Sequence, residues 1–121
     1  MSSDVRAPRQ RIEDMLEAIA RIEAYTHGLD EAGFQSDTKT FDATVRNFEI
    51  LGEASRHVPA PLTGFYTDAP WRRIGDLRNK AIHDYHRLSP ALIYRTARDN
   101  LPGLKVALGR MAATLPPSAD D

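Results

Sequence analysis

An arginine and a histidine that can act together on a phosphate lie five positions apart in this sequence, as Arg78 and His83. An ideal α-helix places side chains at that spacing about 140° apart around its axis, which does not bring them together well. Asn79 and His83, in contrast, are four positions apart and share a helical face. Arg78 and His83 can therefore converge in two ways. Either the helix ends near His83, or both side chains reach a groove shared with a second copy of the chain.

The chemistry that suits this pair is RNA cleavage without a metal ion. The 2′-hydroxyl must lose a proton and the leaving 5′-oxygen must gain one, and an imidazole with a pKa of about 6.5 can do either. The guanidinium of Arg78 stays protonated and can hold the extra negative charge of the phosphorane through two hydrogen bonds. Asn79 can donate a further hydrogen bond or orient His83.

Spacing alone leaves other interpretations open. An R-x4-H spacing arises often by chance, from a surface salt-bridge arginine and a histidine that caps a helix. His83 and His86 are three apart, as two metal ligands on a helical turn would be, but no third ligand follows at a diagnostic spacing, so no metal or cofactor is predicted. His86 is a spare acid–base group, a contact to RNA phosphate or an exposed cap. Glu53 either pairs with Arg78 or Arg72 or lies exposed.

The composition is that of one ordinary water-soluble domain. The chain has 121 residues, of which 41% are apolar and 27% charged. One domain is therefore expected over residues 1–115, followed by a disordered polar tail over 116–121. There is no cysteine, which excludes disulfides and thiolate chemistry. The N-terminus does not have the pattern of a signal peptide, and no apolar run approaches the roughly 18 residues of a membrane span. The expected location is the cytoplasm.

Net charge does not support nucleic-acid binding, but one stretch is locally basic. Sixteen Lys and Arg face seventeen Asp and Glu, for a net charge of −1. Residues 68–87 hold five basic residues and three acids. This window, which contains Arg78 and His83, therefore has a modest positive bias before any histidine is protonated.

Apolar residues recur at three- and four-residue intervals along most of the chain, which predicts helices and no strand. Asp68 and Ser89 each precede a proline, a pattern typical of a helix start with an acceptor cap and a proline in the first turn. Gly52, in the middle of a helical pattern, indicates the close approach of another helix. A break is expected at Pro102. The expected helices cover residues 8–27, 38–57, 70–83 and 90–100, with a further helical pattern over 104–111 and connections over 29–37 and 59–67. The predicted fold is an all-α, up-and-down bundle of four to five helices.

Three stretches resemble the motifs of one protein family. They read WRRIGDLRNKAIHDY at residues 71–85, EILGEAS at residues 49–55 and NLPGL at residues 100–104. In this order they resemble the signature, the second hallmark and the last-helix motif of the HepT-like ribonucleases, which belong to the HEPN superfamily. The resemblance extends over about residues 11–111. The sequence departs from the commonest pattern after Tyr85, where it has His86 instead of an aromatic or small residue.

The resemblance implies a helical homodimer in which Arg78 and His83 meet in a cleft between two protomers and cleave RNA. It also implies that the protein is a toxin whose antitoxin is a minimal nucleotidyltransferase. That partner would transfer AMP units from ATP to the tyrosine two residues after the histidine, which is Tyr85 here. The added phosphate could then occupy the site meant for RNA.

Two other functions remain open alongside the nuclease. The chain can be a non-catalytic module that binds a nucleotide or a nucleotidyltransferase, with Arg78 and His83 holding a phosphate. It can also be a structural homo-oligomer in which these residues only cap helices and bridge protomers. Chelator-resistant RNA cleavage supports the nuclease, and nucleotide or transferase binding without RNA loss supports the binding module. The structural homo-oligomer is supported if the chain has no nucleotide affinity and the alanine variants of Arg78 and His83 lose dimerisation.

Overall fold

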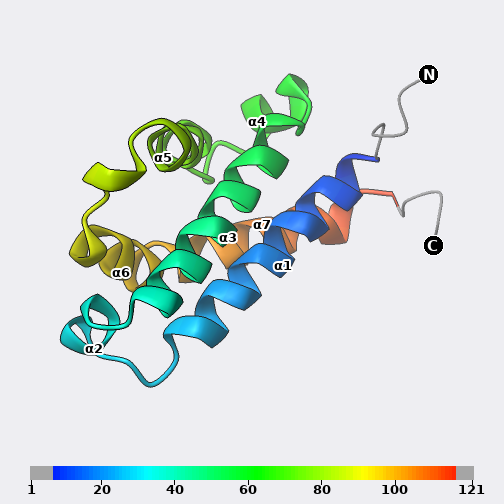
Figure 1. Cartoon of the computed structure of the whole chain (residues 1–121). Coiled ribbons are helices and arrows are strands. Elements are labelled where there is room, and N and C mark those ends of the chain that lie inside the picture. The colour runs from blue at the N-terminus through cyan, green and yellow to red at the C-terminus, as the bar shows by residue number, and fades with distance from the viewer. Residues whose placement is uncertain (1–6, 117–121) are drawn as a thin grey trace.

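The computed structural model describes residues 7–116, and this range contains helices but no strand (Figure 1). The all-α expectation is confirmed, and the five longer helices correspond to the expected helical segments. These helices are α1 (Pro8–Thr26), α3 (Thr38–Arg56), α5 (Trp71–His83), α6 (Pro90–Asp99) and α7 (Leu101–Thr114). Short elements between them are α2 (Glu31–Gln35), α4 (Ala60–Phe65) and the 3-10 turn η1 (Tyr85–Arg87).

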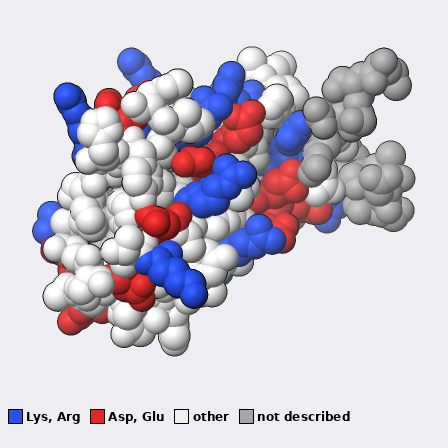
Figure 2. All heavy atoms as spheres, viewed as in Figure 1, with Lys and Arg blue, Asp and Glu red and all other residues white. Residues whose placement is uncertain are grey.

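Helix α3 lies between the two elements that carry most of the charged residues of interest. It packs along α1 and against α5, while α7 packs on α1, and α6 contacts both α7 and α2. In Figure 1, α1 and α3 run side by side across the front of the molecule, with α7 behind them. Figure 2 shows Lys and Arg side chains alternating with Asp and Glu over this front face. Polar residues on the outer side of α3 are thus within reach of both α1 and α5.

The core comes from the apolar faces of α1, α3 and α7. On α1, Ile12, Met15, Ile19 and Ile22 are fully buried. Burying such a side chain stabilises the fold by roughly 1.5–3 kcal/mol. The corresponding buried stripes on the other two helices are Val45, Phe48 and Leu51, and Leu104, Leu108 and Met111. This burial fixes the rotation of α3 about its axis and therefore decides which of its side chains face solvent.

Both segments expected to be connections contain a short helix, so these two expectations are wrong. In residues 29–37, the carboxylate of Asp30 accepts a hydrogen bond from the backbone N–H of Gly33 at 2.7 Å and starts α2. Phe34 on that helix is fully buried. In residues 59–67, α4 forms with a proline in its first turn. Helices of 5 and 6 residues are too short to show an apolar stripe in the sequence.

The prediction that Asp68 caps a helix is wrong, and the prediction that Ser89 caps one is confirmed. No side chain caps α5, which begins at Trp71 directly after Pro70. Asp68 instead forms an ion pair with Arg110 of α7. Ser89 does cap α6, because its hydroxyl accepts a hydrogen bond from the backbone N–H three residues later, at 3.3 Å.

The break expected at Pro102 lies two residues earlier, at Asn100, which separates α6 from α7. Pro102 belongs to the first turn of α7, where its missing N–H leaves no hydrogen bond unmade. The expected tail over residues 116–121 lies outside the described residues apart from Pro116. None of the described helices is long and apolar enough to cross a membrane.

Asp37 caps α3 and should make the stability of the protein depend on pH. Its carboxylate accepts hydrogen bonds from the backbone N–H of Thr40 at 3.0 Å and from the Thr40 hydroxyl at 2.8 Å. These hydrogen bonds hold the pKa of Asp37 below its ordinary value of 3.8. A lowered folded-state pKa stabilises the fold above the unfolded-state pKa, and this contribution is lost as the pH falls through the folded-state value.

We therefore expect Asp37→Asn, which keeps an acceptor for the cap but cannot titrate, to be less sensitive to acid. Thermal unfolding followed by circular dichroism from about pH 5 down to pH 2 should show a smaller fall in Tm than in the wild type. Equal falls in both proteins would show that Asp37 does not contribute to the acid sensitivity.

Candidate active site

Gly52 allows α5 to lie unusually close to α3. A methyl group at Gly52 would lie 2.2 Å from the Cβ of Arg78, 2.7 Å from its Cγ and 3.2 Å from the carbonyl oxygen of Ile74. Carbon atoms in favourable contact are about 3.5–4.0 Å apart, so only a glycine fits without rearrangement. The close helix approach expected from the sequence is confirmed. The stem of Arg78 is consequently packed directly on α3.

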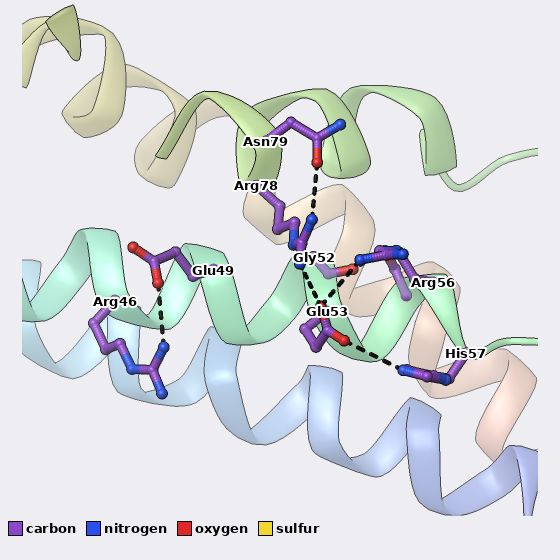
Figure 3. Close-up of polar contacts among 9 residues, drawn as sticks. Arg46, Glu49, Gly52, Glu53, Arg56, His57, Arg78 and Asn79 are labelled. Atoms are coloured by element: carbon purple, nitrogen blue, oxygen red, sulfur yellow. Dashed lines mark hydrogen bonds and ion pairs between the residues drawn. The ribbon is translucent and has the colours of Figure 1, made fainter. Parts of the chain in front are cut away.

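The guanidinium of Arg78 is held by two neighbours (Figure 3). Its Nη2 donates to Oε2 of Glu53 on α3 at 2.8 Å, and its Nη1 donates to Oδ1 of Asn79 at 3.0 Å. Of the two pairings expected for Glu53, the structure has the one with Arg78, while Arg72 is exposed. The side chain of Arg78 is only 17% exposed, and its Nε is buried with no acceptor among the described residues. A buried donor left unsatisfied costs about 1–3 kcal/mol.

Glu53 gathers positive groups around one carboxylate, as Figure 3 shows. Besides Arg78, His57 Nε2 lies 3.3 Å from Oε1 and Arg56 Nη1 lies 3.5 Å from Oε2. Burial alone would raise the pKa of Glu53, but the hydrogen bond with His57 and the charges of Arg78 and Arg56 outweigh it, so the pKa lies below its ordinary value. His57 was not expected in the site. Its position four residues after Glu53, on the same helical face, is the signal that could have indicated it.

A charged hollow of about 490 Å³ lies beside Arg78, between α1, α3 and α5. Four arginines and four acidic residues line it. Three of these arginines form ion pairs with a lining carboxylate: Arg21 with Glu17 at 2.7 Å, Arg46 with Glu49 at 3.1 Å and Arg78 with Glu53 at 2.8 Å. Exposed ion pairs contribute only about 0–1 kcal/mol each. The pairs formed by Arg21 and Arg46 are therefore weak restraints on these side chains.

His83 and Arg78 face different surroundings within one chain. His83 lies in the last turn of α5 and is exposed, and its side chain makes no hydrogen bond or ion pair with the described residues. It does not line the hollow, although the preceding residue Ile82 does. Asn79 connects the two sides, since it contacts Arg78 and lies one helical turn before His83. His86, in η1, is likewise exposed.

Tyr85 leaves the end of α5 and returns to α3. Its hydroxyl donates a hydrogen bond to Oδ1 of Asp42, and its ring centroid lies 6.0 Å from that of Phe41. The hydrogen bond to Asp42 is the largest cause of a raised pKa for Tyr85, followed by burial and the negative charges of Asp42 and Glu49. Nothing in the sequence pointed to Asp42, because 43 residues separate it from Tyr85 and no pattern links them.

The clustered side chains suit anion binding better than metal binding. Among residues 7–116, no group of three or more His, Cys, Asp or Glu could hold a metal ion. Arg78 lies at the edge of the hollow and is held by Glu53, and His83 is exposed at the end of the same helix.

The fold and site define an all-helical protein with an R-x4-H-x-Y motif at the end of one helix. The chain belongs to the Ribonuclease HepT-like family, which it matches over residues 15–111. The family expected from the three sequence motifs is thereby confirmed.

Several named relatives cover most of this chain. It is 34% identical over 100 residues to "Probable ribonuclease HepT" of Thermococcus cleftensis, a match that covers 83% of this chain and 91% of that protein. It is 31% identical over 99 residues to "Putative RNase MJ0127" of Methanocaldococcus jannaschii, with 82% and 79% covered. It is 28% identical over 101 residues to "Putative RNase TTE0752" of Caldanaerobacter subterraneus subsp. tengcongensis, with 84% and 90% covered. No solved structure gives a significant match.

Proposed function

We propose that the protein is a metal-independent endoribonuclease. The main support is the state of the R-x4-H motif in a chain of the HepT-like family. Its guanidinium is held at the edge of a charged hollow, and its imidazole is exposed. The ribonuclease names of the relatives agree with RNA as the substrate.

In the proposed reaction, Glu53 and Asn79 keep hold of the guanidinium of Arg78, and Arg78 binds the scissile phosphate through its remaining N–H groups. The 2′-oxygen attacks phosphorus and the 5′-oxygen leaves, which yields a cyclic phosphate and a 5′-hydroxyl. His83 transfers the proton at one of these oxygens, and Arg78 stabilises the charge on the phosphorane. Asn79 keeps the guanidinium in place from the side that faces His83.

The active unit in this proposal is a homodimer. One chain presents Arg78 to the hollow and His83 to other surroundings. A second copy can bring its own histidine to the first arginine, and symmetry then builds the site twice. The exposed apolar side chain of Ile82, next to His83, is available for such a contact.

We also propose that this enzyme is a cytoplasmic toxin controlled by a minimal nucleotidyltransferase antitoxin that uses ATP. The partner would transfer AMP to Tyr85, which is 42% exposed and lies two residues from His83. Each AMP adds a negative phosphate and a bulky base, and both would oppose entry of an RNA strand. Tyr85→Phe should cleave RNA like the wild type but keep its activity when the antitoxin and ATP are added, as measured by RNA cleavage after incubation with both.

The activity is tested by incubating the purified chain with RNA in the presence of EDTA. We expect cleavage that the chelator does not reduce, with cyclic phosphate at the new 3′ ends, detected by mass spectrometry. Cleavage that stops with EDTA and returns with a divalent cation would contradict the metal-independent reaction.

The separation of His83 from the hollow favours one alternative, a non-catalytic module that binds a nucleotide phosphate or a nucleotidyltransferase. In this case Arg78 would bind phosphate and His83 would not transfer protons. Calorimetry with ATP and with the transferase separates the two functions. Binding with intact RNA at high protein concentration supports the module, and chelator-resistant cleavage supports the nuclease.

Glu53→Gln should affect activity far more than stability. The side chains of the ion pair are 48% exposed for Glu53 and 17% exposed for Arg78. Because the amide keeps an acceptor for the less exposed Arg78, the free energy of unfolding should change by only about 1 kcal/mol. The neutral amide keeps an oxygen acceptor but loses the charge that holds Arg78, and we expect kcat for RNA cleavage to fall about 10-fold, less than the roughly 100-fold that a misplacement of 1 Å can cost. Urea unfolding and initial cleavage rates measure the two effects. A large loss of stability with unchanged kcat would assign Glu53 a structural role instead.

A further inference from the structure

The hydroxyl of Tyr85 already has a carboxylate partner within its own chain. It donates a hydrogen bond to Asp42, an exposed residue near the start of α3, and the neighbouring Phe41 ring packs at 6.0 Å from the Tyr85 ring. Tyr25 is a useful comparison, because it is 39% exposed against 42% for Tyr85. Its hydroxyl has no hydrogen-bond partner among residues 7–116. The two tyrosines are thus similarly exposed, but only the hydroxyl of Tyr85 is hydrogen-bonded to a carboxylate among the described residues.

We propose that Asp42 accepts the phenolic proton when Tyr85 is modified by AMP, so that the modified chain supplies the base for its own modification. This inference rests on the proposed function, in which Tyr85 is the acceptor. The Tyr85 oxygen attacks the α-phosphorus of a nucleoside triphosphate and forms the new O–P bond. The bond from that phosphorus to the oxygen bridging to the β-phosphate breaks, and pyrophosphate leaves with the electron pair. The phenolic proton passes to the Asp42 carboxylate and then to water.

A tyrosine hydroxyl is almost fully protonated near neutral pH, so it needs a proton acceptor, and the hydrogen bond places one beside Tyr85. Because Asp42 stabilises the neutral phenol, the pKa of Tyr85 is raised and little phenolate exists near neutral pH. The proton must therefore leave during the attack, and a carboxylate already bonded to the hydroxyl is placed to take it. Glu49, also on α3, is the other charged group that acts on this phenol. It lines the hollow and is paired with Arg46.

The test uses the full chain and adenosine 5′-phosphorimidazolide, an activated AMP donor that needs no enzyme. After labelling, acid removes AMP from histidines, and mass spectrometry of tryptic peptides compares Tyr85 with Tyr25 in the same sample. We expect Tyr85 to be labelled on the order of 100-fold faster than Tyr25 at neutral pH, the lower range for general-base catalysis. Asp42→Asn should lower Tyr85 to the rate of Tyr25, and Asp42→Glu should restore part of the difference.

A pH series separates a proton acceptor from a residue that only positions the ring. Above about pH 10 the phenol ionises without help, so Asp42→Asn should approach the wild-type rate there, whereas a positioning defect would persist at every pH. The proposal would be overturned if Tyr85 of the Asp42→Asn protein is labelled at the wild-type rate at neutral pH. It would also be overturned if Tyr85 and Tyr25 of the wild type are labelled at equal rates. RNA cleavage assayed on the same samples keeps the two hypotheses apart. A chain that labels as expected but does not cut RNA contradicts only the nuclease.

Discussion

His83→Ala should lower the rate of RNA cleavage by about 100- to 10,000-fold, the range that a general acid or base contributes. The fold should stay intact, because His83 is exposed and makes no polar contact with the described residues. Initial rates on a defined RNA, together with circular dichroism, measure both effects. His27→Ala is the matched control, since His27 is also exposed and lies directly after the end of α1, as His83 lies at the end of α5. Full activity of His83→Ala would remove this histidine from the mechanism.

Mixing inactive variants tests whether the site is built from two chains. In a dimer of Arg78→Ala with His83→Ala, one site receives Arg78 from one chain and His83 from the other. Unfolding and refolding the two variants together should therefore restore part of the activity if the site is shared between protomers. If each site uses both residues of a single chain, every site in the mixture lacks one of them, and no activity should return.

Gly52→Ala should destabilise the protein by about 1–3 kcal/mol, as is typical when a well-packed contact is overfilled. The added methyl group would lie 2.2 Å from the Cβ of Arg78, so α5 must move away from α3. That movement also separates Arg78 from Glu53, and we expect most RNA cleavage to be lost. Urea unfolding and cleavage assays measure the two losses.

Gly109→Ala provides the control for the chemical change itself. Gly109 is exposed on α7, and a methyl group there would meet nothing within 4 Å. Because alanine favours helices over glycine, this variant should be more stable by about 0.5–1 kcal/mol. Similar stability changes at both glycines would show that α3 and α5 do not depend on the Gly52 contact.

The sequence predicts the long helices of this fold because each one buries a continuous apolar stripe. Ile12, Met15 and Ile19 recur at helical intervals and are all fully buried, so periodicity alone locates α1. The short helices α2 and α4 cannot be predicted in this way, because an element of one or two turns is too short to show a repeated apolar spacing. Asp68 was wrongly predicted to cap a helix because its partner lies far away in the sequence. Its carboxylate forms an ion pair with Arg110 of α7 instead.

The candidate site is predictable in its residue types and only partly in its geometry. The glycine at 52 indicated a close approach, but the sequence could not tell that the side chain filling the space was Arg78. The spacing between Arg78 and His83 correctly indicated poor convergence on one helix. The contact between Asp42 and Tyr85 depends on how α5 ends and η1 folds back on α3, and no local pattern encodes that path.

Arg78 packs against Gly52, so this one residue both fills the contact between α3 and α5 and provides a charged group. Its Cβ and Cγ fill the notch that the glycine leaves, while its guanidinium reaches Glu53. Truncation to alanine empties part of that notch, so it confuses a packing defect with a chemical one. Lysine keeps the same carbon stem and replaces the flat, forked head by a single ammonium point. An intact but silenced form of this protein, suitable for trapping bound RNA, is therefore better sought in Arg78→Lys than in Arg78→Ala.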